Sequence, residues 1–336
     1  MNTSTNTTMT TPIRHPSRRG LITAALLLCA FTRAGAQSTY PNKPITLVVP
    51  FAPGGIADIT ARTVAEVMAK SLGQAIVVDN RPSAGSIVGS SLVAKAAPDG
   101  YTLLLMSNGN AVSAGLFKKL PFDVTKDFAP ISTLGFFDLG VFVGSGSRFT
   151  SLAEVVKFAK ANPGKLTIGT IAVGSTQHLS AELFKTLSGI DAVIVPYKGS
   201  PAVITALRSG EIDLGFEILG PMLPQVSGKA IRALAITSDK RDSTLPEVPT
   251  VQESGVAGYN VASWNALAAP AGTPADIVER LNRAAREAEA SPAVQKRLLE
   301  LGVRAQAGTP KQLETLLASE IKRWGDVIRA AKIDPE

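Results

Sequence analysis

The alternation of short apolar runs with amphipathic stretches constrains the fold of this chain more than any other feature. The runs are short and rich in β-branched residues, as in strands buried on both faces. They cover 45–49, 75–78, 101–106, 166–169, 192–195, 212–216 and 231–237. In the stretches between them apolar residues recur every three or four positions, as on one face of a helix. These stretches are 58–71, 87–97, 152–161, 175–187 and 202–208. The alternation predicts an α/β fold with mainly parallel sheets flanked by helices.

The first 36 residues have the pattern of a secretory signal peptide. Arg14, Arg18 and Arg19 precede an apolar run at 21–31, and small residues end at Ala36. This run is about half of the ~20 residues that a membrane-spanning helix needs. We therefore expect cleavage after residue 36 and a periplasmic protein. Export by the Sec or the twin-arginine route fits, since the arginine pair also resembles a twin-arginine signal.

Removal of this leader changes what the chain can do chemically. It leaves 30 basic and 27 acidic residues, a net charge of +3, without the clustered charge of a nucleic-acid-binding protein. It also removes Cys29, the only cysteine, and leaves His178 as the only histidine. We therefore expect no disulfide, no metal site, no cofactor and no catalytic residues. An exported hydrolase is a much weaker alternative, because the sequence lacks G-x-S-x-G and HExxH motifs.

The remaining 300 residues are more than one core usually holds, so two lobes are expected. Two further strand-like segments, 137–143 and 259–268, bracket one block of strand–helix units and are interpreted as strands that cross between the lobes. This reading gives a first lobe of 41–140 plus 262–336, a second lobe of 141–261, and a ligand cleft between them.

The C-terminal helices are expected over 277–289 and 312–330, packed on the first lobe. Thr273 is interpreted as the N-cap that opens them, with Pro274 at the first helical position.

The loop after the first strand is a candidate anion site. In open α/β sheets ligands bind beyond the carboxyl ends of strands. Phe51, Gly54, Gly55 and Asp58 lie between the first strand and a helix, where paired glycines allow close backbone approach and the helix terminus favours an anion. The alternative is an ordinary tight turn with Asp58 as helix N-cap.

A second loop, rich in small and hydroxyl residues, is a candidate for closing on the same anion. It contains Thr170, Gly174, Ser175 and Thr176, again between a strand and a helix. The alternative is that one of the hydroxyls simply caps the helix. His178, inside that helix, is interpreted as a packed or loop-supporting residue, since the chain offers no partner nucleophile or second histidine.

Other polar residues near strand ends are candidates for reading the rest of a ligand. Ser107 and Asn108 follow one strand, Tyr197 and Lys198 follow another, and Glu217 ends a third. For Tyr197 and Lys198 the alternative is that they are solvated loop residues.

The spacing of motifs along the whole mature chain resembles the Bug family of periplasmic receptors. The matching segments are YPNKPITLVVPFAPGGIADITAR, VDNRPSAGSIVG, PDGYTLL, GSTQHLSAELF, VPYKGSPAVITALRSGEID, IRALAITSDKR, LPEVPTVQESG and APAGTP. The resemblance implies a two-lobed periplasmic binding protein, type II-like, with strands crossing between α/β lobes. It also implies that a ligand carboxylate is held between the loops at 51–58 and 170–176, largely by backbone groups and bridging waters.

Four positions depart from the family pattern. Ser83, Ser86 and Ala172 stand where the family often has glycine, so the loop conformations there are not carried over. Glu217 stands where aspartate is common, so its contact with the far end of a ligand is left open.

The expected function is that of an extracytoplasmic solute-binding protein that captures a small organic carboxylate for a tripartite tricarboxylate transporter. The expected partners are the ligand and integral-membrane transporter subunits. The alternative is an orphan receptor that reports its ligand to a sensor protein.

Overall fold

The computed structural model of the protein describes residues 1–4, 8–9, 40–171 and 173–335. Its contacts divide the chain into Met1–Asn42 and Lys43–Glu336, and every helix and strand below belongs to the second unit. The apolar run and cleavage point of the predicted signal peptide lie outside the described residues. Within the described ranges, no helix has the length and apolar composition needed to cross a membrane.

The first sheet combines parallel and antiparallel strands. Its order is β2-β1-β3-β9-β4, and β10 pairs with β4 as well. The pairs β1–β2 and β1–β3 are parallel, while β3–β9, β9–β4 and β4–β10 are antiparallel. The strands are β1 (Ile45–Val49), β2 (Ile76–Asn80), β3 (Thr102–Ser107), β4 (Phe128–Gly144), β9 (Ala262–Pro270) and β10 (Val303–Ala305).

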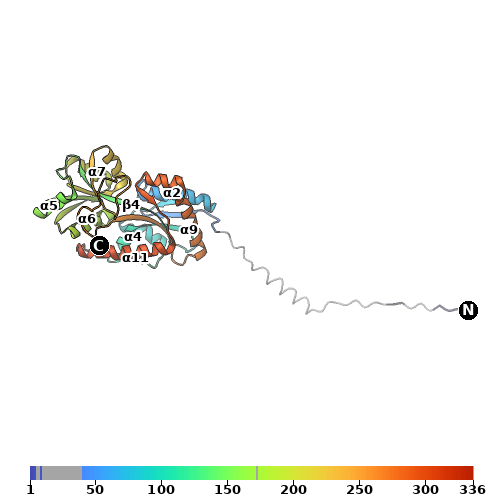
Figure 1. Ribbon diagram of the computed structural model, residues 1–336. Helices are drawn as coiled ribbons and strands as arrows, with labels where there is room; N and C mark the ends of the chain where they lie inside the picture. The colour runs from blue at the N-terminus through green and yellow to red at the C-terminus, as the bar shows by residue number, and fades with distance from the viewer. Residues whose placement is uncertain (5–7, 10–39, 172, 336) are drawn as a thin grey trace. The chain divides into compact units, whose positions relative to one another are not determined.

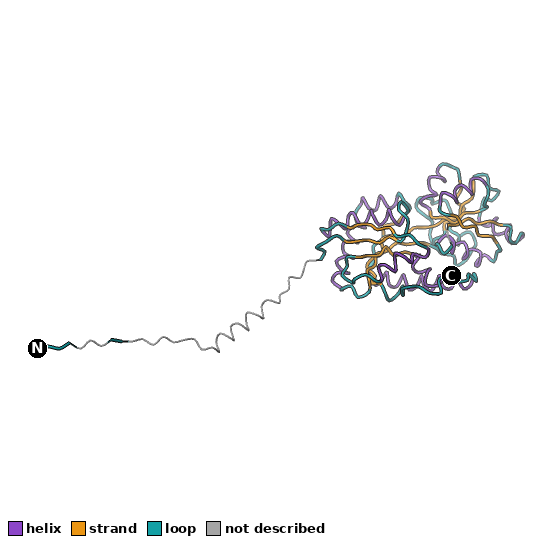
Figure 2. The backbone as a smooth tube through the Cα atoms, turned by 180° about the vertical axis from the view of Figure 1, so that it is seen from behind, coloured by secondary structure: helices purple, strands orange, loops and turns teal. Residues whose placement is uncertain are grey.

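The second sheet begins where the first one ends, because β4 belongs to both. Residues 128–138 of β4 pair with β9, and residues 139–144 pair with β7 and β8. Beyond β7 the order continues through β5 to β6, and both of these pairs are parallel. The remaining strands are β5 (Leu166–Ile171), β6 (Ala192–Tyr197), β7 (Leu214–Ile218) and β8 (Ile231–Ile236). Figure 2 shows the strands of the two sheets as neighbouring groups.

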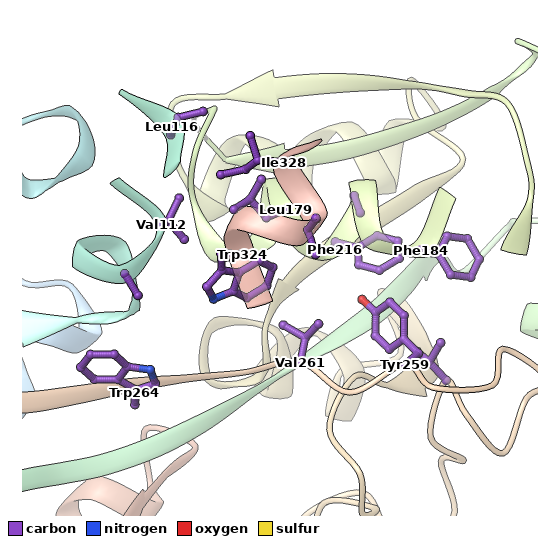
Figure 3. Close-up of a cluster of buried hydrophobic side chains, with 14 of the residues drawn as sticks. Val112, Leu116, Leu179, Phe184, Phe216, Tyr259, Val261, Trp264, Trp324 and Ile328 are labelled. Carbon is purple, nitrogen blue, oxygen red and sulfur yellow. The ribbon is translucent and has the colours of Figure 1, made fainter. Parts of the chain in front are cut away.

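Helices connect the parallel strands and cover the sheets. They are α2 (Ile56–Leu72), α3 (Ile87–Ala94), α4 (Asn108–Leu116), α5 (Leu152–Ala161), α6 (Thr176–Ser188), α7 (Ser200–Ser209), α8 (Leu219–Ser227), α9 (Ala275–Glu289), α10 (Pro292–Leu299) and α11 (Pro310–Ala330). Helix α2 packs against α9, and α11 packs against α4 and reaches α6 (Figure 1). Trp324 of α11 is fully buried, among side chains that include Val112 of α4 and Leu179 of α6 (Figure 3).

The predicted α/β class is confirmed. The parallel pairs expected from the strand–helix alternation are present, and β4 and β9 add antiparallel pairs to make the sheets mixed. The two segments interpreted as crossing strands fall within β4 and largely within β9. The predicted lobe boundaries, with 141–261 as the second lobe, stay a prediction.

One predicted helix cap is wrong. The N-cap of α9 is Pro274 rather than Thr273, and the Thr273 hydroxyl donates to the carbonyl of Pro270 (2.7 Å). Because this hydroxyl is bonded to the carbonyl at the end of β9, it does not cap the first turn of α9. The predicted Thr–Pro arrangement occurs instead at α11, where Thr309 caps and Pro310 opens the helix.

Candidate functional site

The carboxyl ends of the parallel strands in both sheets carry all the predicted ligand-binding residues. Strands β1 and β3 lead into α2 and α4, while β5, β6 and β7 lead into α6, α7 and α8. Two close approaches bring these ends together, and each is seen at a glycine that has no room for a side chain. A methyl group added at Gly220, in the first turn of α8, would lie 3.4 Å from Ile56 Cδ1, so the first turns of α8 and α2 lie close to each other. One added at Gly174, in the β5–α6 loop, would lie 2.3 Å from Leu116 Cδ2 of α4.

Asp58 organises the β1–α2 loop from within. Its buried carboxylate accepts hydrogen bonds from the Gly54 amide (2.9 Å), Arg62 Nε (3.0 Å) and Asn80 Nδ2 (2.9 Å). Burial works to raise the pKa of Asp58, but these hydrogen bonds together outweigh it and lower that pKa. Asp58 is therefore an ionised organiser of the loop. The alternative that it caps α2 is wrong, because the N-cap is Gly55.

The first turn of α2 retains amides that an anion can use. The Gly54 amide is occupied by Asp58, whereas Gly55 is an N-cap without a side-chain hydrogen bond. The amides that open a helix have no intrahelical acceptor, so those from Gly55 to Ala57 remain for an outside partner. The backbone of Gly55 is extended (φ −80°), and an added methyl group would meet nothing nearer than the Ala52 carbonyl at 3.8 Å. The space at the side-chain position of Gly55 is thus open.

Asn80 is a site residue that sequence reasoning missed. Besides its bond to Asp58, its Nδ2 donates to the Phe51 carbonyl (3.0 Å), and its Oδ1 accepts from Arg62 (2.9 Å). It therefore holds the predicted residue Phe51 through the backbone. The only sequence signal for Asn80 is its place in the VDNRP motif at the end of β2.

In the β5–α6 loop, Ser175 caps α6, as the alternative reading had it. Its hydroxyl oxygen accepts from the His178 amide (3.1 Å). Gly174 has φ +78°, a conformation that favours glycine, in addition to its close approach to α4. The buried Thr170 hydroxyl donates to the Ile171 carbonyl (3.0 Å). These side chains shape the loop rather than face open space.

Asn108 and Thr176 join the two sets of strand ends. Asn108 is fully buried, and its Nδ2 donates to Thr176 Oγ1 (2.9 Å). Its Oδ1 accepts from Trp324 Nε1 (2.7 Å), and Thr176 Oγ1 also contacts Ser263 Oγ (3.3 Å). Trp324 and Ser263 were not foreseen. The preceding residue, Ser107, caps α4 by accepting from the Gly109 amide (3.1 Å).

Glu217 and Tyr197 differ in where their polar atoms are placed. Glu217 is fully buried, and its Oε2 accepts from Ser200 Oγ (2.8 Å) and from the Ile218 amide (3.0 Å). Burial raises the pKa of Glu217 to about 7, although these bonds oppose the shift. The hydroxyl of Tyr197 instead donates to Glu211 (2.8 Å), and burial together with that carboxylate raises the pKa of Tyr197 to about 12. The structure thus commits this hydroxyl to a neighbour, and Lys198 is exposed.

Comparisons with known proteins agree with this architecture. A family model described as "Tripartite tricarboxylate transporter family receptor" matches residues 60–333. A Rhodopseudomonas palustris protein, Rpa4515, solved with adipate, is 36% identical (TM-score 0.80) and covers 88% of this chain and 100% of its own. MatC from the same organism, solved with malate, is 33% identical (TM-score 0.76), with 86% and 100% coverage. The periplasmic binding protein BugD is 30% identical (TM-score 0.78), with 88% and 100% coverage.

Proposed function

We propose, from the premise that this chain belongs to the tripartite tricarboxylate transporter family of receptors, that it captures a small organic carboxylate in the periplasm. The family is one of non-enzymatic solute-binding proteins, and relatives with the same fold are described with adipate and with malate. The further parts of the proposal are the route by which the carboxylate is held and the partner that receives it.

The observation that carries the binding proposal is that Asp58 bonds only one of the backbone amides in the β1–α2 loop. Asp58 takes the Gly54 amide, and the amides from Gly55 to Ala57 have neither a side-chain cap nor an intrahelical acceptor at the start of a 17-residue helix. A helix terminus contributes roughly 0.3 to 1 kcal/mol to anion binding, and each hydrogen bond to a charged group about 1.5 to 3 kcal/mol. Several such contributions hold a carboxylate without an arginine or lysine.

The family and the sequence together support the proposed location and partners. BugD is described as a periplasmic binding protein, and the leader of this chain has the pattern of an export signal. The receiving partner in this proposal is the integral-membrane part of a tripartite transporter, loaded by the receptor after its two lobes close on the ligand.

A screen for the ligand tests the proposal. Ligand-stripped protein is melted in the presence of mono-, di- and tricarboxylates, and a ligand at one hundred times its Kd stabilises by about 2.7 kcal/mol. We expect a rise in melting temperature with at least one of these acids. If none raises it, while neutral sugars or amines do, carboxylate capture is wrong.

Two variants test how the carboxylate is held. Gly55→Val should leave the fold intact, since the backbone and the space at Gly55 accept a side chain, but abolish measurable binding because the side chain covers the amides. Lys198→Ala should lower affinity less than tenfold, or about 1.4 kcal/mol. Calorimetry on both folded variants decides: loss of binding in Lys198→Ala with normal binding in Gly55→Val would assign the anion to a side-chain cation.

A further inference from the structure

One indole N–H is shared by two acceptors next to the residues that join the strand ends. Trp324 Nε1 donates to Asn108 Oδ1 (2.7 Å) and to Glu320 Oε2 (2.8 Å). The tryptophan and the asparagine are each 0% exposed, so water does not compete for this N–H. Figure 3 shows the Trp324 ring beside Val112 of α4 and Leu179 of α6. The N–H therefore lies in a packed interior, where its bonds constrain the acceptors.

The bond from Trp324 decides which way the Asn108 amide is turned. An indole nitrogen donates and cannot accept, so the atom of Asn108 that faces it must be the oxygen. The Nδ2 group is then directed to Thr176 Oγ1, to which it donates (2.9 Å). With the amide turned the other way, two donors would face each other across the 2.7 Å separation. The tryptophan thus determines the donor that Asn108 presents to the first residue of α6.

Trp324 is itself anchored by two other residues of the chain. Glu320, one turn earlier in α11 and only 7% exposed, accepts from the indole with Oε2 and from Arg323 Nη1 with Oε1 (2.9 Å). Arg323 also donates to the carbonyl of Asn260, in the segment that enters β9. Both oxygens of this carboxylate therefore have partners. The indole is held by contacts that involve neither Asn108 nor Thr176.

We propose that Trp324 is a positioning residue for ligand binding, which acts through Asn108 to hold α6 against α4 while a ligand is bound. This inference rests on the proposed capture of a carboxylate between two lobes. Asn108 and Thr176 belong to different lobes in that proposal, so their bond exists in the closed form and is lost on opening. Fixing the Asn108 amide therefore slows the release of the ligand and has little effect on its entry.

A double-mutant cycle without ligand tests the route through Asn108. Trp324→Phe keeps a buried aromatic ring but removes the N–H, and Thr176→Val removes the hydroxyl at similar volume. The two side chains have no hydrogen bond to each other, and each bonds a different atom of the Asn108 amide. In urea unfolding, their combined effect on the unfolding equilibrium constant should be at least about twofold smaller than the product of the single effects.

The same cycle in an Asn108→Ala background separates this route from direct contact. There the two effects should simply multiply, because the amide that connects Trp324 with Thr176 is gone. Independent effects in the wild-type background, or a coupling that survives Asn108→Ala, would overturn the proposal.

Rapid filtration with radiolabelled acids tests the effect on release from the full chain. The probes are acetate, benzoate, succinate, glutarate and citrate, and each acid that the wild type binds is used. Trp324→Phe should raise the dissociation rate about three- to tenfold, as expected for the loss of one buried hydrogen bond. The association rate should change less than about twofold. A folded Trp324→Phe variant with the wild-type dissociation rate would overturn the proposal.

Trp264→Phe is the matched control. Trp264 is 1% exposed, and its Nε1 has no hydrogen-bond partner among the described residues, so the same substitution removes an N–H that makes no bond there. Its dissociation rate should stay within about twofold of the wild type. Equal acceleration in both variants would refute a specific role for Trp324. Failure of the wild type to bind any of the five acids would refute carboxylate capture, whereas the absence of coupling in urea would refute the role of Trp324 alone.

Discussion

Replacing Glu289 with methionine should stabilise the protein at pH 7 by about 3 kcal/mol. Glu289 ends α9, and its side chain is only 4% exposed. Neither carboxyl oxygen has a hydrogen-bond partner in the part of the chain that the structure describes. Burial raises the pKa of this carboxyl from its ordinary value of 4.5 to about 8.

The sign and size follow from comparing the folded and unfolded chains. Below pH 4.5 the Glu289 carboxyl is protonated in both states, and its ionisation does not affect stability. Between pH 4.5 and about 8 the unfolded chain loses this proton while the folded chain keeps it. The free energy of unfolding therefore falls by about 1.4 kcal/mol per pH unit, which amounts to about 3 kcal/mol at pH 7. Methionine has a similar length and no ionisable group, so it removes this loss.

Urea unfolding followed by far-ultraviolet circular dichroism at pH 5, 6, 7 and 8 measures the effect without ligand. The stability difference between Glu289→Met and wild type should grow with pH. Glu279→Met, at an exposed glutamate on the same helix paired with Arg283, is the control and should change stability by less than about 0.5 kcal/mol at each pH. A difference that stays constant from pH 5 to pH 8 would show that the Glu289 carboxyl ionises near its ordinary pKa, which refutes the reasoning.

Two other predictions concern the contacts between the strand ends. Gly174→Ala should destabilise the protein by about 1 to 3 kcal/mol and weaken ligand binding, because a side chain there meets Leu116 and the backbone has φ +78°. Gly189→Ala is the control for the backbone effect alone, because Gly189 has φ +63° but an added side chain would have no atom within 4 Å. It should lower the free energy of unfolding in urea by about 1 kcal/mol without affecting ligand binding. Equal effects of the two variants would mean that the contact with Leu116 contributes nothing. In a double-mutant cycle, Asn108→Ala and Thr176→Val should show a coupling of about 0.5 to 3 kcal/mol in unfolding free energy, and additive effects would mean that their 2.9 Å hydrogen bond contributes nothing.

Local sequence patterns predicted the helices and strands in which apolar residues follow the pattern typical of that element. β1 occupies its predicted range, and α5 matches its predicted 152–161. Helices α4 and α8 were not predicted. The first is rich in asparagine, glycine and serine, and the second contains Pro224, so neither has a strong intrinsic preference for helix. Packing of α4 against α11, almost 200 residues later in the chain, supplies what its local sequence lacks.

Sequence patterns predicted which loops are candidates for ligand binding but not the direction of the side chains in them. Asp58 and Asn108 were expected to contact ligand, yet both are committed to protein partners. Those partners are distant in sequence: Asn80 is 22 residues from Asp58, and Trp324 is 216 residues from Asn108. The spacing of residues within one helix or strand relates only residues that are close in sequence. It therefore carries no information about hydrogen bonds between residues that are far apart in the chain. The prediction that glycines and backbone amides matter in these loops needed only local information.

The strand β4 joins the two sheets through its own backbone. It changes partner between Asp138 and Leu139 without leaving the extended conformation, so the two sheets are joined by continuous backbone hydrogen bonding. At this point the Thr237 hydroxyl accepts from the Leu139 amide (3.2 Å) and donates to the Val261 carbonyl (2.7 Å), which ties β4 to the chain entering β9. A displacement of one sheet relative to the other must therefore change the twist of β4, because the two sheets share this strand.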